Sequence, residues 1–381
     1  MTTLLQQWQP LDLTSEAVTF PATMYTSPDV YKLEQECIFG KAWYYVGNTS
    51  QLQDPGSYFT IDIAEQPLII LRNRAGDLRA FFNICSHRAA PLALGSGQCN
   101  HLTCLYHAWT FDLEGNLRGA PEMDDAEGFD PACHSLRAVK VDTWESFIFV
   151  NLDLNAKPLA TQLGDLPEKF KRYRLKDWVL VHSINYEMAA NWKLLTENSA
   201  ESYHEPSVHA LVPKFYKGLR TEAKQFYYWQ YSPMIAEMDA AARAVLKPEG
   251  LSLEGLSEDE SNGVSITSLF PNFGMSVGPS FAVSYLIDPQ GPAKTRVQQQ
   301  WLVPNQSAAL SAERLEAMIG FFDTVMKEDL DLLPHVQKRM QSSGFRPGRL
   351  SPSREMGTHL FQQLVMQHLT SGSSRTISTP Y

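Results

Sequence analysis

The chain has 381 residues, of which 44% are hydrophobic and 19% are charged, as in ordinary globular proteins with one or two domains. Its formal net charge of −10 at pH 7 argues against nucleic acid or an anionic membrane as the main partner. We find neither a secretion signal nor an apolar run near the roughly 18 residues that cross a bilayer, so a cytoplasmic location is predicted. The five cysteines are too sparse for a disulfide framework, which favours a reducing compartment.

The predicted elements fall into three segments. Residues 1–40 are expected to hold a short helix that Ser27 caps. Residues 41–154 contain short β-branched and aromatic runs separated by turn signals, which predicts a small all-β domain with strands at 57–63, 67–73, 78–84, 102–112 and 146–153. Residues 155–381 mix both elements, with strands predicted at 178–188, 265–270, 273–277, 280–287 and 295–303 and helices at about 191–205 and 312–340.

Two cysteine–histidine pairs form the first candidate site. The sequences C-S-H at 85–87 and C-L-Y-H at 104–107 each supply one thiolate and one imidazole. Structural zinc also takes two cysteines and two histidines, but zinc fingers usually place both cysteines on one arm. One ligand of each kind from each arm suits a [2Fe–2S] cluster of the Rieske type, in which one iron takes both cysteines and the other both histidines. We predict such a cluster, with zinc or chance as the alternatives, on Cys85, His87, Cys104 and His107.

A second candidate site lies in the sequence E-S-Y-H-E-P-S-V-H at 201–209. In an α-helix Glu201 and His204 share a face, and Pro206 should loosen the helix so that His209 swings back beside His204. Two histidines and one carboxylate bind Fe(II) and leave positions open for O₂ and substrate. We therefore predict that His204 and His209 bind a mononuclear iron.

The third iron ligand is expected on the helix predicted at 312–340, which offers the carboxylates Asp323, Glu328, Asp329 and Asp331. The predicted apolar stripe of that helix has Asp329 where an apolar residue belongs, and it continues through Leu332, Val336 and Met340. A buried carboxylate is costly without a partner, and a metal is such a partner. Asp329 is thus the predicted ligand, unless it is a helix-face aspartate with a hydrogen-bonding mate, and the other three carboxylates are predicted to point away.

Both patterns together resemble the catalytic α subunit of Rieske non-haem iron oxygenases, the ring-hydroxylating family, over most of the chain. The sequence of 191–209, NWKLLTENSAESYHEPSVH, is similar to the family pattern N-W-K…E-N…(D/E)-x-Y-H-x₄-H. The resemblance implies an α+β fold. A Rieske β-sandwich of residues 41–154 would be inserted in a START-like, helix-grip catalytic domain that consists of residues 1–40, its helical N-terminal part, and residues 155–381.

The resemblance also implies roles and partners. Glu201 would be a bridging carboxylate that links His204 to the cluster ligand His107 of a neighbouring subunit in a homotrimer. Many members have Asp at this place, and Glu resembles the members that oxidise quaternary ammonium compounds such as carnitine or glycine betaine. The chain lacks a dinucleotide-binding fingerprint, because Asn100 occupies the place of the third glycine. Electrons from NAD(P)H must therefore arrive through a separate flavin/iron–sulfur reductase or a ferredoxin.

The predicted function is the terminal oxygenase of a two-component system, which uses O₂ to mono- or dihydroxylate or demethylate a small molecule. N-methylated cations are favoured as substrates, and aromatic rings or aromatic acids are the alternative. The aromatic residues at 226–229 and 270–285 could form a cation–π box, an aromatic slot or ordinary packing. Two other classes stay open: a Rieske electron-transfer subunit without catalysis, and a START-like binding protein with structural zinc.

Overall fold

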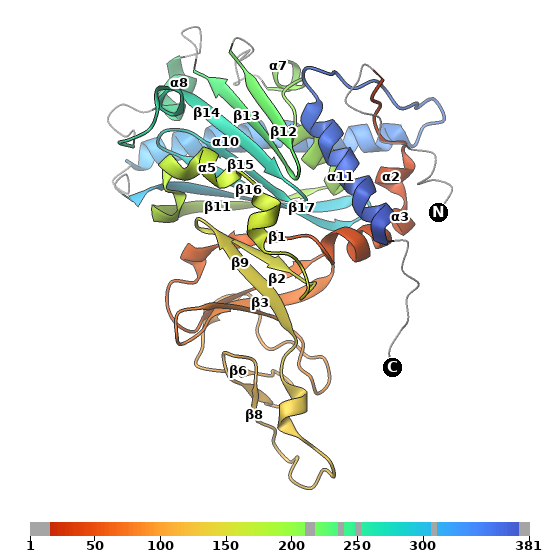
Figure 1. Cartoon of the computed structure of the whole chain (residues 1–381), viewed down its shortest axis with the longest axis vertical. Helices are drawn as coiled ribbons and strands as arrows, with labels where there is room; N and C mark the ends of the chain where they lie inside the picture. The colour runs from red at the N-terminus through yellow and green to blue at the C-terminus, as the bar shows by residue number, and fades with distance from the viewer. Residues whose placement is uncertain (1–15, 210–217, 235–239, 248–252, 306–310, 373–381) are drawn as a thin grey trace. The chain divides into compact units, whose positions relative to one another are not determined.

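The computed structural model describes residues 16–209, 218–234, 240–247, 253–305 and 311–372 (Figure 1). The chain forms two compact units, one made of Phe39–Leu159 and the other made of the segments on either side of it. Antiparallel sheets and helices occur together, so the α+β prediction is confirmed. Within the described residues, no helix has both the length and the apolar composition needed to cross a bilayer.

Short strands build the smaller unit and place its two cysteine–histidine loops. One sheet has the order β1-β10-β9-β4-β3-β2-β5, and a small sheet has the order β6-β7-β8. The run predicted at 102–112 is split into β6 and β7 by a turn that carries Cys104 and His107. The strands are β1 (Tyr44–Asn48), β2 (Ser57–Ile63), β3 (Gln66–Arg72), β4 (Leu78–Phe82), β5 (Ser96–Gln98), β6 (Leu102–Thr103), β7 (Thr110–Phe111), β8 (Leu117–Gly119), β9 (Ala138–Trp144) and β10 (Phe147–Asn151).

A single seven-stranded antiparallel sheet forms the base of the larger unit, in the order β11-β17-β16-β15-β14-β13-β12. All five strands predicted in this part of the chain are present, whereas β12 and β13 were not predicted. The strands are β11 (Trp178–Met188), β12 (Arg220–Lys224), β13 (Tyr227–Pro233), β14 (Gly263–Leu269), β15 (Phe273–Val277), β16 (Ala282–Gly291) and β17 (Lys294–Pro304).

Helices pack on this sheet, and the longest one, α10, crosses behind it in Figure 1. Phe322 of α10 packs on Phe281, with ring centroids 5.1 Å apart, in a core shared with Trp301 of β17. The predicted helix at 312–340 is confirmed, as is the cap of α3, where Ser27 Oγ accepts from the Val30 N–H. The helices are α2 (Thr23–Thr26), α3 (Pro28–Glu34), α4 (Leu159–Leu163), α5 (Leu166–Phe170), α6 (Trp192–Ser199), α7 (Glu205–Val208), α8 (Ala240–Leu246), α9 (Glu258–Ser261), α10 (Ala312–Met340) and α11 (Met356–Gly372).

The buried stripe of α10 differs from the predicted one in its second half. Asp329 is buried as predicted, but the buried positions after it are Leu330, Leu333 and Gln337, while Leu332 is 41% exposed. The predicted stripe used a repeat of 3.5 residues per turn, which belongs to supercoiled helix pairs. A helix on a sheet keeps about 3.6 residues per turn, so the two stripes separate along a helix of this length.

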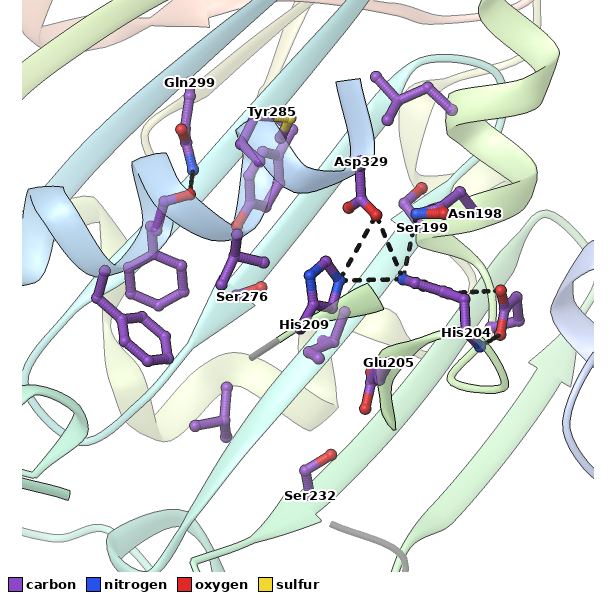
Figure 2. A pocket seen from close by; sticks show the side chains of 18 of the residues that line it. Asn198, Ser199, His204, Glu205, His209, Ser232, Ser276, Tyr285, Gln299 and Asp329 are labelled. Atoms are coloured by element: carbon purple, nitrogen blue, oxygen red, sulfur yellow. Dashed lines mark hydrogen bonds and ion pairs between the residues drawn. The ribbon is translucent and has the colours of Figure 1, made fainter. Parts of the chain in front are cut away.

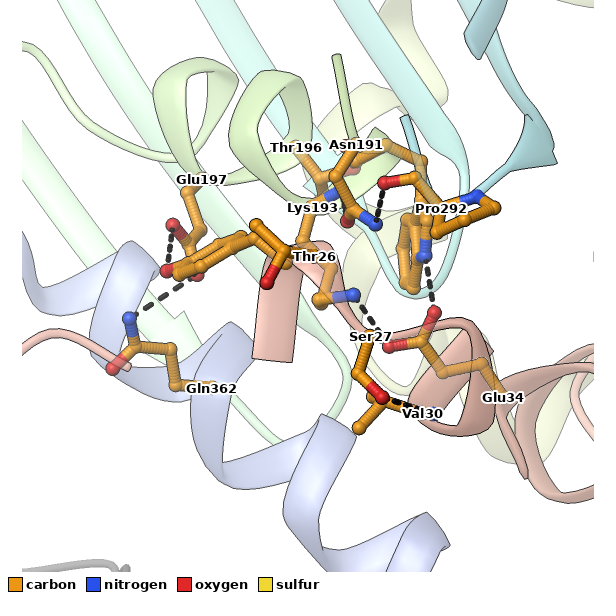
Figure 3. A network of polar contacts seen from close by, with 12 residues as sticks. Thr26, Ser27, Val30, Glu34, Asn191, Lys193, Thr196, Glu197, Pro292 and Gln362 are labelled. Atoms are coloured by element: carbon orange, nitrogen blue, oxygen red, sulfur yellow. Dashed lines mark hydrogen bonds and ion pairs between the residues drawn. The ribbon is translucent and has the colours of Figure 1, made fainter. Parts of the chain in front are cut away.

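Helix α6 is held at its base by a buried polar network that involves both ends of the described chain (Figure 3). The Lys193 ammonium lies 2.5 Å from the Glu34 carboxylate of α3, and neither side chain is exposed. Glu197 accepts hydrogen bonds from Tyr25 (2.9 and 2.8 Å) and from Gln362 of α11 (3.1 Å). Because its charges and donors are paired inside the protein, α6 is a fixed base for the segment that follows it.

Candidate functional site

The two cysteine–histidine loops of the smaller unit share one backbone conformation. In each loop the cysteine N–H donates to the carbonyl five residues later (2.9 and 2.8 Å), and the cysteine carbonyl accepts from the N–H four residues later (2.9 and 3.2 Å). The turn requires a left-handed residue in each loop, Ala89 with φ 58° and Ala108 with φ 56°. Left-handed alanine costs on the order of 1 kcal/mol, and such strain gathers at functional sites. The sequence contains no signal for this left-handed conformation at Ala89 and Ala108.

The four predicted cluster ligands come together between these loops. Cys85 and Cys104 are 2% and 4% exposed, and the rings of His87 and His107 lie 4.7 Å apart. Burial raises the pKa of the Cys85 thiol; it would do the same at Cys104, but backbone N–H groups of the second loop outweigh it there and lower the pKa. His107 Nδ1 is buried and has no hydrogen-bond partner among the described residues. An unpaired imidazole nitrogen beside two thiols and a second imidazole fits the ligand set of a Rieske cluster.

Trp109 closes this site on one side. Its ring stacks on that of His87, with centroids 4.7 Å apart and planes within 8°. Phe129 and His134 pack against the other edges of the indole. The tryptophan therefore shields one face of the cluster site from solvent.

The segment at 201–209 is not the loosened helix that was predicted. Helix α6 ends at Ser199, before Glu201, and α7 begins anew at Glu205. The Glu201 carboxylate accepts from the backbone N–H groups of Tyr203 and His204, so the side chain replaces the hydrogen bonds that a continued helix would make. Pro206 falls in the first turn of α7, where its missing N–H is harmless.

This turn and the short helix bring the two histidines together. His204 Nε2 and His209 Nε2 are 3.2 Å apart, and Asp329 Oδ1 of α10 lies 3.6 and 3.5 Å from them (Figure 2). The other ring nitrogens face carboxylates: His204 Nδ1 is 2.5 Å from Glu201, and His209 Nδ1 is 2.9 Å from Glu328. If each Nδ1–H donates a hydrogen bond to its carboxylate, the Nε2 lone pairs of the two rings face each other, an arrangement that a bound cation stabilises.

The electrostatics of these residues fit a metal ion. Asp329 Oδ1 is buried and has no hydrogen-bond partner in the described segments, and burial raises the pKa of its carboxyl group. Burial alone would lower the pKa of His204, but the adjacent Glu201 overrides it and the pKa is raised. Two imidazole nitrogens and one carboxylate oxygen around a common point form the donor set that suits non-haem Fe(II).

Sequence reasoning missed two residues at this site. Glu328 was predicted to point away, yet its carboxylate contacts His209; metal-binding histidines usually donate to a carboxylate, and that rule was the available signal. Asn198, which places its amide 3.2 Å from His204 Nε2, carries no such signal. The predictions hold for Asp323, which binds Tyr186 and Lys327, and for Asp331, which is exposed.

A cavity of about 160 Å³ opens beside the three converging residues. A cavity of roughly this size holds a benzene-sized molecule. Its described lining contains no lysine or arginine and is mainly apolar, with Tyr285, Phe321 and Phe322 as its aromatic members. Of the aromatic residues singled out in the sequence, only Tyr285 belongs to this described lining, while Phe226, Tyr227, Tyr228 and Phe270 line a smaller, separate cavity.

The described lining of the cavity includes three carboxylates, those of Glu201, Glu205 and Asp329. Burial raises the pKa of Glu205 to about 7, and His204 opposes that shift. Glu205 had no assigned role in the sequence analysis. The end of the cavity where the histidines lie thus carries the carboxylates, and most of the remaining described lining is apolar.

Comparisons with known proteins place both sites in context. Residues 175–371 match the ring hydroxylating alpha subunit (catalytic domain), and residues 42–140 match the Rieske [2Fe-2S] domain. The chain is 31% identical to the carnitine monooxygenase oxygenase subunit of Acinetobacter pittii, over 92% of this chain and 95% of the relative. It is 28% identical to the chloroplastic choline monooxygenase of Spinacia oleracea, over 96% and 82%. A solved quaternary ammonium Rieske monooxygenase superposes on this chain with a TM-score of 0.80 at 30% identity, over 93% of this chain and 96% of the other. That structure is described in connection with carnitine oxidation and inter-subunit electron transfer.

Proposed function

This chain belongs to the Rieske oxygenases with a ring-hydroxylating α subunit, and from that premise we propose that it oxidises a small quaternary ammonium compound. The predicted enzyme class is confirmed: the chain is an oxidoreductase that uses O₂, a [2Fe–2S] cluster and a mononuclear iron, with electrons supplied by a reductase. The match to the Rieske [2Fe-2S] domain excludes the alternative of a binding protein with structural zinc. The match to the catalytic domain of the ring hydroxylating alpha subunit excludes an electron-transfer subunit without catalysis.

The proposed ligands of the cluster are Cys85, His87, Cys104 and His107. Those proposed for the iron are His204, His209 and Asp329. One observation carries the iron assignment: the orphaned Asp329 oxygen faces two Nε2 atoms whose rings are already held through Nδ1. When bound, the iron supplies the open positions at which O₂ and substrate meet. The protein's own part is to hold both imidazoles, through Glu201 and Glu328, and to shape the cavity beside them.

Glu201 is proposed to act in electron transfer as well. It already holds His204 at Nδ1, and it lines the cavity. In a head-to-tail homotrimer it would also accept a hydrogen bond from His107 of the partner subunit and so connect two metal centres. The inter-subunit electron transfer described for a relative supports this arrangement. We further propose the cytoplasm as the site of action, where a reductase can draw on NAD(P)H.

The cavity supports a cationic substrate over an aromatic acid. An anionic acid would require a basic partner, and the described lining contains none. The test is product analysis with a surrogate reductase, NADH and separate additions of choline, L-carnitine, glycine betaine and benzoate. We expect NADH oxidation and an oxidised product with at least one quaternary ammonium compound. Hydroxylation of benzoate, with no turnover of any quaternary ammonium compound, would contradict the proposal.

A further inference from the structure

Among the described residues, four carboxylates lie near the paired imidazoles, and one of them forms no contact with a ring nitrogen of either histidine. Glu201 and Glu328 lie 2.5 and 2.9 Å from an Nδ1 atom, and Asp329 lies 3.5 and 3.6 Å from the two Nε2 atoms. Within the described part of the chain, Glu205 contacts no ring nitrogen, although it lines the same cavity. Its charge is therefore available to something other than the histidines.

A buried amide contacts Glu205, one of the cavity-lining residues labelled in Figure 2. Gln230 Nε2 donates to Glu205 Oε1 over 3.4 Å and to Ser232 Oγ over 3.1 Å, and Gln230 Oε1 accepts from Tyr228 over 2.7 Å. The glutamine is 1% exposed, so its orientation is fixed by these three bonds. Glu205 is partly exposed and belongs to the cavity lining.

Among the described residues, Glu205 has neither a lysine or arginine partner nor a short hydrogen bond to its carboxylate. A hydrogen bond of 3.4 Å from a neutral amide is long and weak, and a partly desolvated carboxylate needs a stronger partner. Neither lysine nor arginine occurs in the described lining. A positively charged occupant of the cavity would pair with this carboxylate, which is not one of the proposed iron ligands. A quaternary ammonium group fits this site. It cannot donate a hydrogen bond, so it binds through electrostatic attraction and through contact with apolar or aromatic side chains, such as Phe321, Phe322 and Tyr285.

We propose that Glu205 is the specificity-determining residue that selects a positively charged headgroup, and that the preferred substrate carries no carboxylate of its own. This inference rests on the proposed function and narrows it. A zwitterion such as carnitine would bring a fourth carboxylate into a cavity whose described lining already holds those of Glu201, Glu205 and Asp329. An alcohol such as choline brings only the cation and a hydroxyl group, for which Ser232, Ser276 or Gln299 of the lining can provide a hydrogen bond.

The test separates the effect of the ligand's positive charge from the effect of its shape. Dissociation constants are measured by calorimetry on the anaerobic holoenzyme for choline, for its neutral isostere 3,3-dimethylbutan-1-ol and for L-carnitine. We expect the unmodified enzyme to bind choline roughly 10- to 100-fold more tightly than the isostere, since the charge interaction is made in a cavity of low polarity. Carnitine should bind more weakly than choline. Glu205→Gln should remove most of the preference for choline over the isostere while leaving affinity for the isostere within about threefold.

Two further variants make the result decisive. Glu316→Gln changes an exposed glutamate of α10 and should alter no affinity. Glu205→Asp keeps the charge and should keep the order of affinities even if Glu205→Gln disturbs iron content, which is measured on every sample. Unchanged choline affinity in Glu205→Gln, equal binding of choline and isostere by the unmodified enzyme, or tighter binding of carnitine than choline would overturn the inference. Failure of the unmodified enzyme to bind any quaternary ammonium compound would overturn the proposed function itself.

Discussion

Each of the two histidines at the candidate iron site has one ring nitrogen committed to a carboxylate and the other turned toward its neighbour. His204 uses Glu201, which lies three residues before it, and His209 uses Glu328, which lies on α10. The carboxylates fix ring orientation and the position of the Nδ1 proton, so both Nε2 atoms are prepared for a metal. Sequence spacing predicted both histidines, but only the folded structure reveals Glu328, because that contact joins residues far apart in the chain.

Asp329 should decide whether iron is retained. Asp329→Ala removes the one carboxylate oxygen that faces both Nε2 atoms, so we expect most of the mononuclear iron and all turnover to be lost. Asp331→Ala is the matched control, because that side chain is exposed on the same helix and should leave the iron content unchanged. Metal analysis of both purified variants checks this. An empty site in Asp331→Ala with a full one in Asp329→Ala would show that the assignment is wrong.

The two metal centres should be separable by mutation, since their proposed ligands share no residue. His87→Ala should abolish the visible absorption of the cluster, because the ring that stacks on Trp109 also supplies a ligand. His204→Ala should keep that absorption and lose the mononuclear iron. Visible spectra and iron counts on the same samples give the answer. A colourless but folded His204→Ala protein would contradict the separation.

Glu201→Gln should uncouple the centres without emptying them. The amide retains the size of the side chain but is a poorer acceptor for two imidazoles than a carboxylate. We expect both metals to remain and the oxidation of the reduced cluster, with substrate and O₂ present, to slow by about tenfold or more. Stopped-flow absorption of the reduced enzyme measures this rate. Unchanged single-turnover kinetics would remove the proposed bridging role of Glu201.

At the scale of secondary-structure elements, the sequence predicted the long, regular pieces well. Helix α10 has the predicted bounds, and β2, β11 and β15 coincide with predicted strands, because period and turn signals are strong there. The predicted C-terminal end of α6 was wrong because the Glu201 carboxylate accepts hydrogen bonds from the backbone that follows it. These bonds compete with the backbone hydrogen bonds of a continued helix, and hydrophobic periodicity gives no sign of them. The left-handed alanines of the cluster loops were likewise not predictable, since alanine rarely adopts that conformation.

Helix α6 depends on the buried carboxylate of Glu197. Glu197→Ala would leave the Tyr25 hydroxyl and the Gln362 amide without their acceptor, and we expect a loss of about 2–3 kcal/mol in the free energy of unfolding. Burial raises the pKa of Glu197 to about 7, so its stabilising effect is complete below pH 4.5 and declines as pH rises toward 7.

Glu197→Gln carries no proton to lose and therefore escapes that decline. Relative to the unmodified protein, this variant should gain on the order of 3 kcal/mol of unfolding free energy between pH 4.5 and pH 8. Urea unfolding of both proteins at these two pH values measures the difference. A difference that does not change with pH would mean that the buried carboxylate is ionised throughout.

For the whole molecule, the division into two units matches the division of chemistry. All four proposed cluster ligands lie in Phe39–Leu159, and the three proposed iron ligands lie in the other unit. In the sequence, each motif stands within a segment of distinct composition, the cluster motif in 41–154 and the iron motif in 155–381. The sequence could not predict the cavity, because its walls on β14, β16 and α10 come together only in the folded protein. Most of the aromatic residues that the sequence suggested for a binding site lie outside the described lining of this cavity.

The most direct test of the central claim, that this chain is an oxygenase of quaternary ammonium compounds, is a single turnover under ¹⁸O₂. The enzyme is reduced chemically, separated from reductant and mixed with choline, L-carnitine or glycine betaine and labelled oxygen. Mass spectrometry then follows the product while absorption follows the cluster. The account predicts oxidation of the cluster and one ¹⁸O atom in the initial product from at least one of these compounds, with none in a His204→Ala control. Oxidation of the cluster without labelled product from any of them would contradict it.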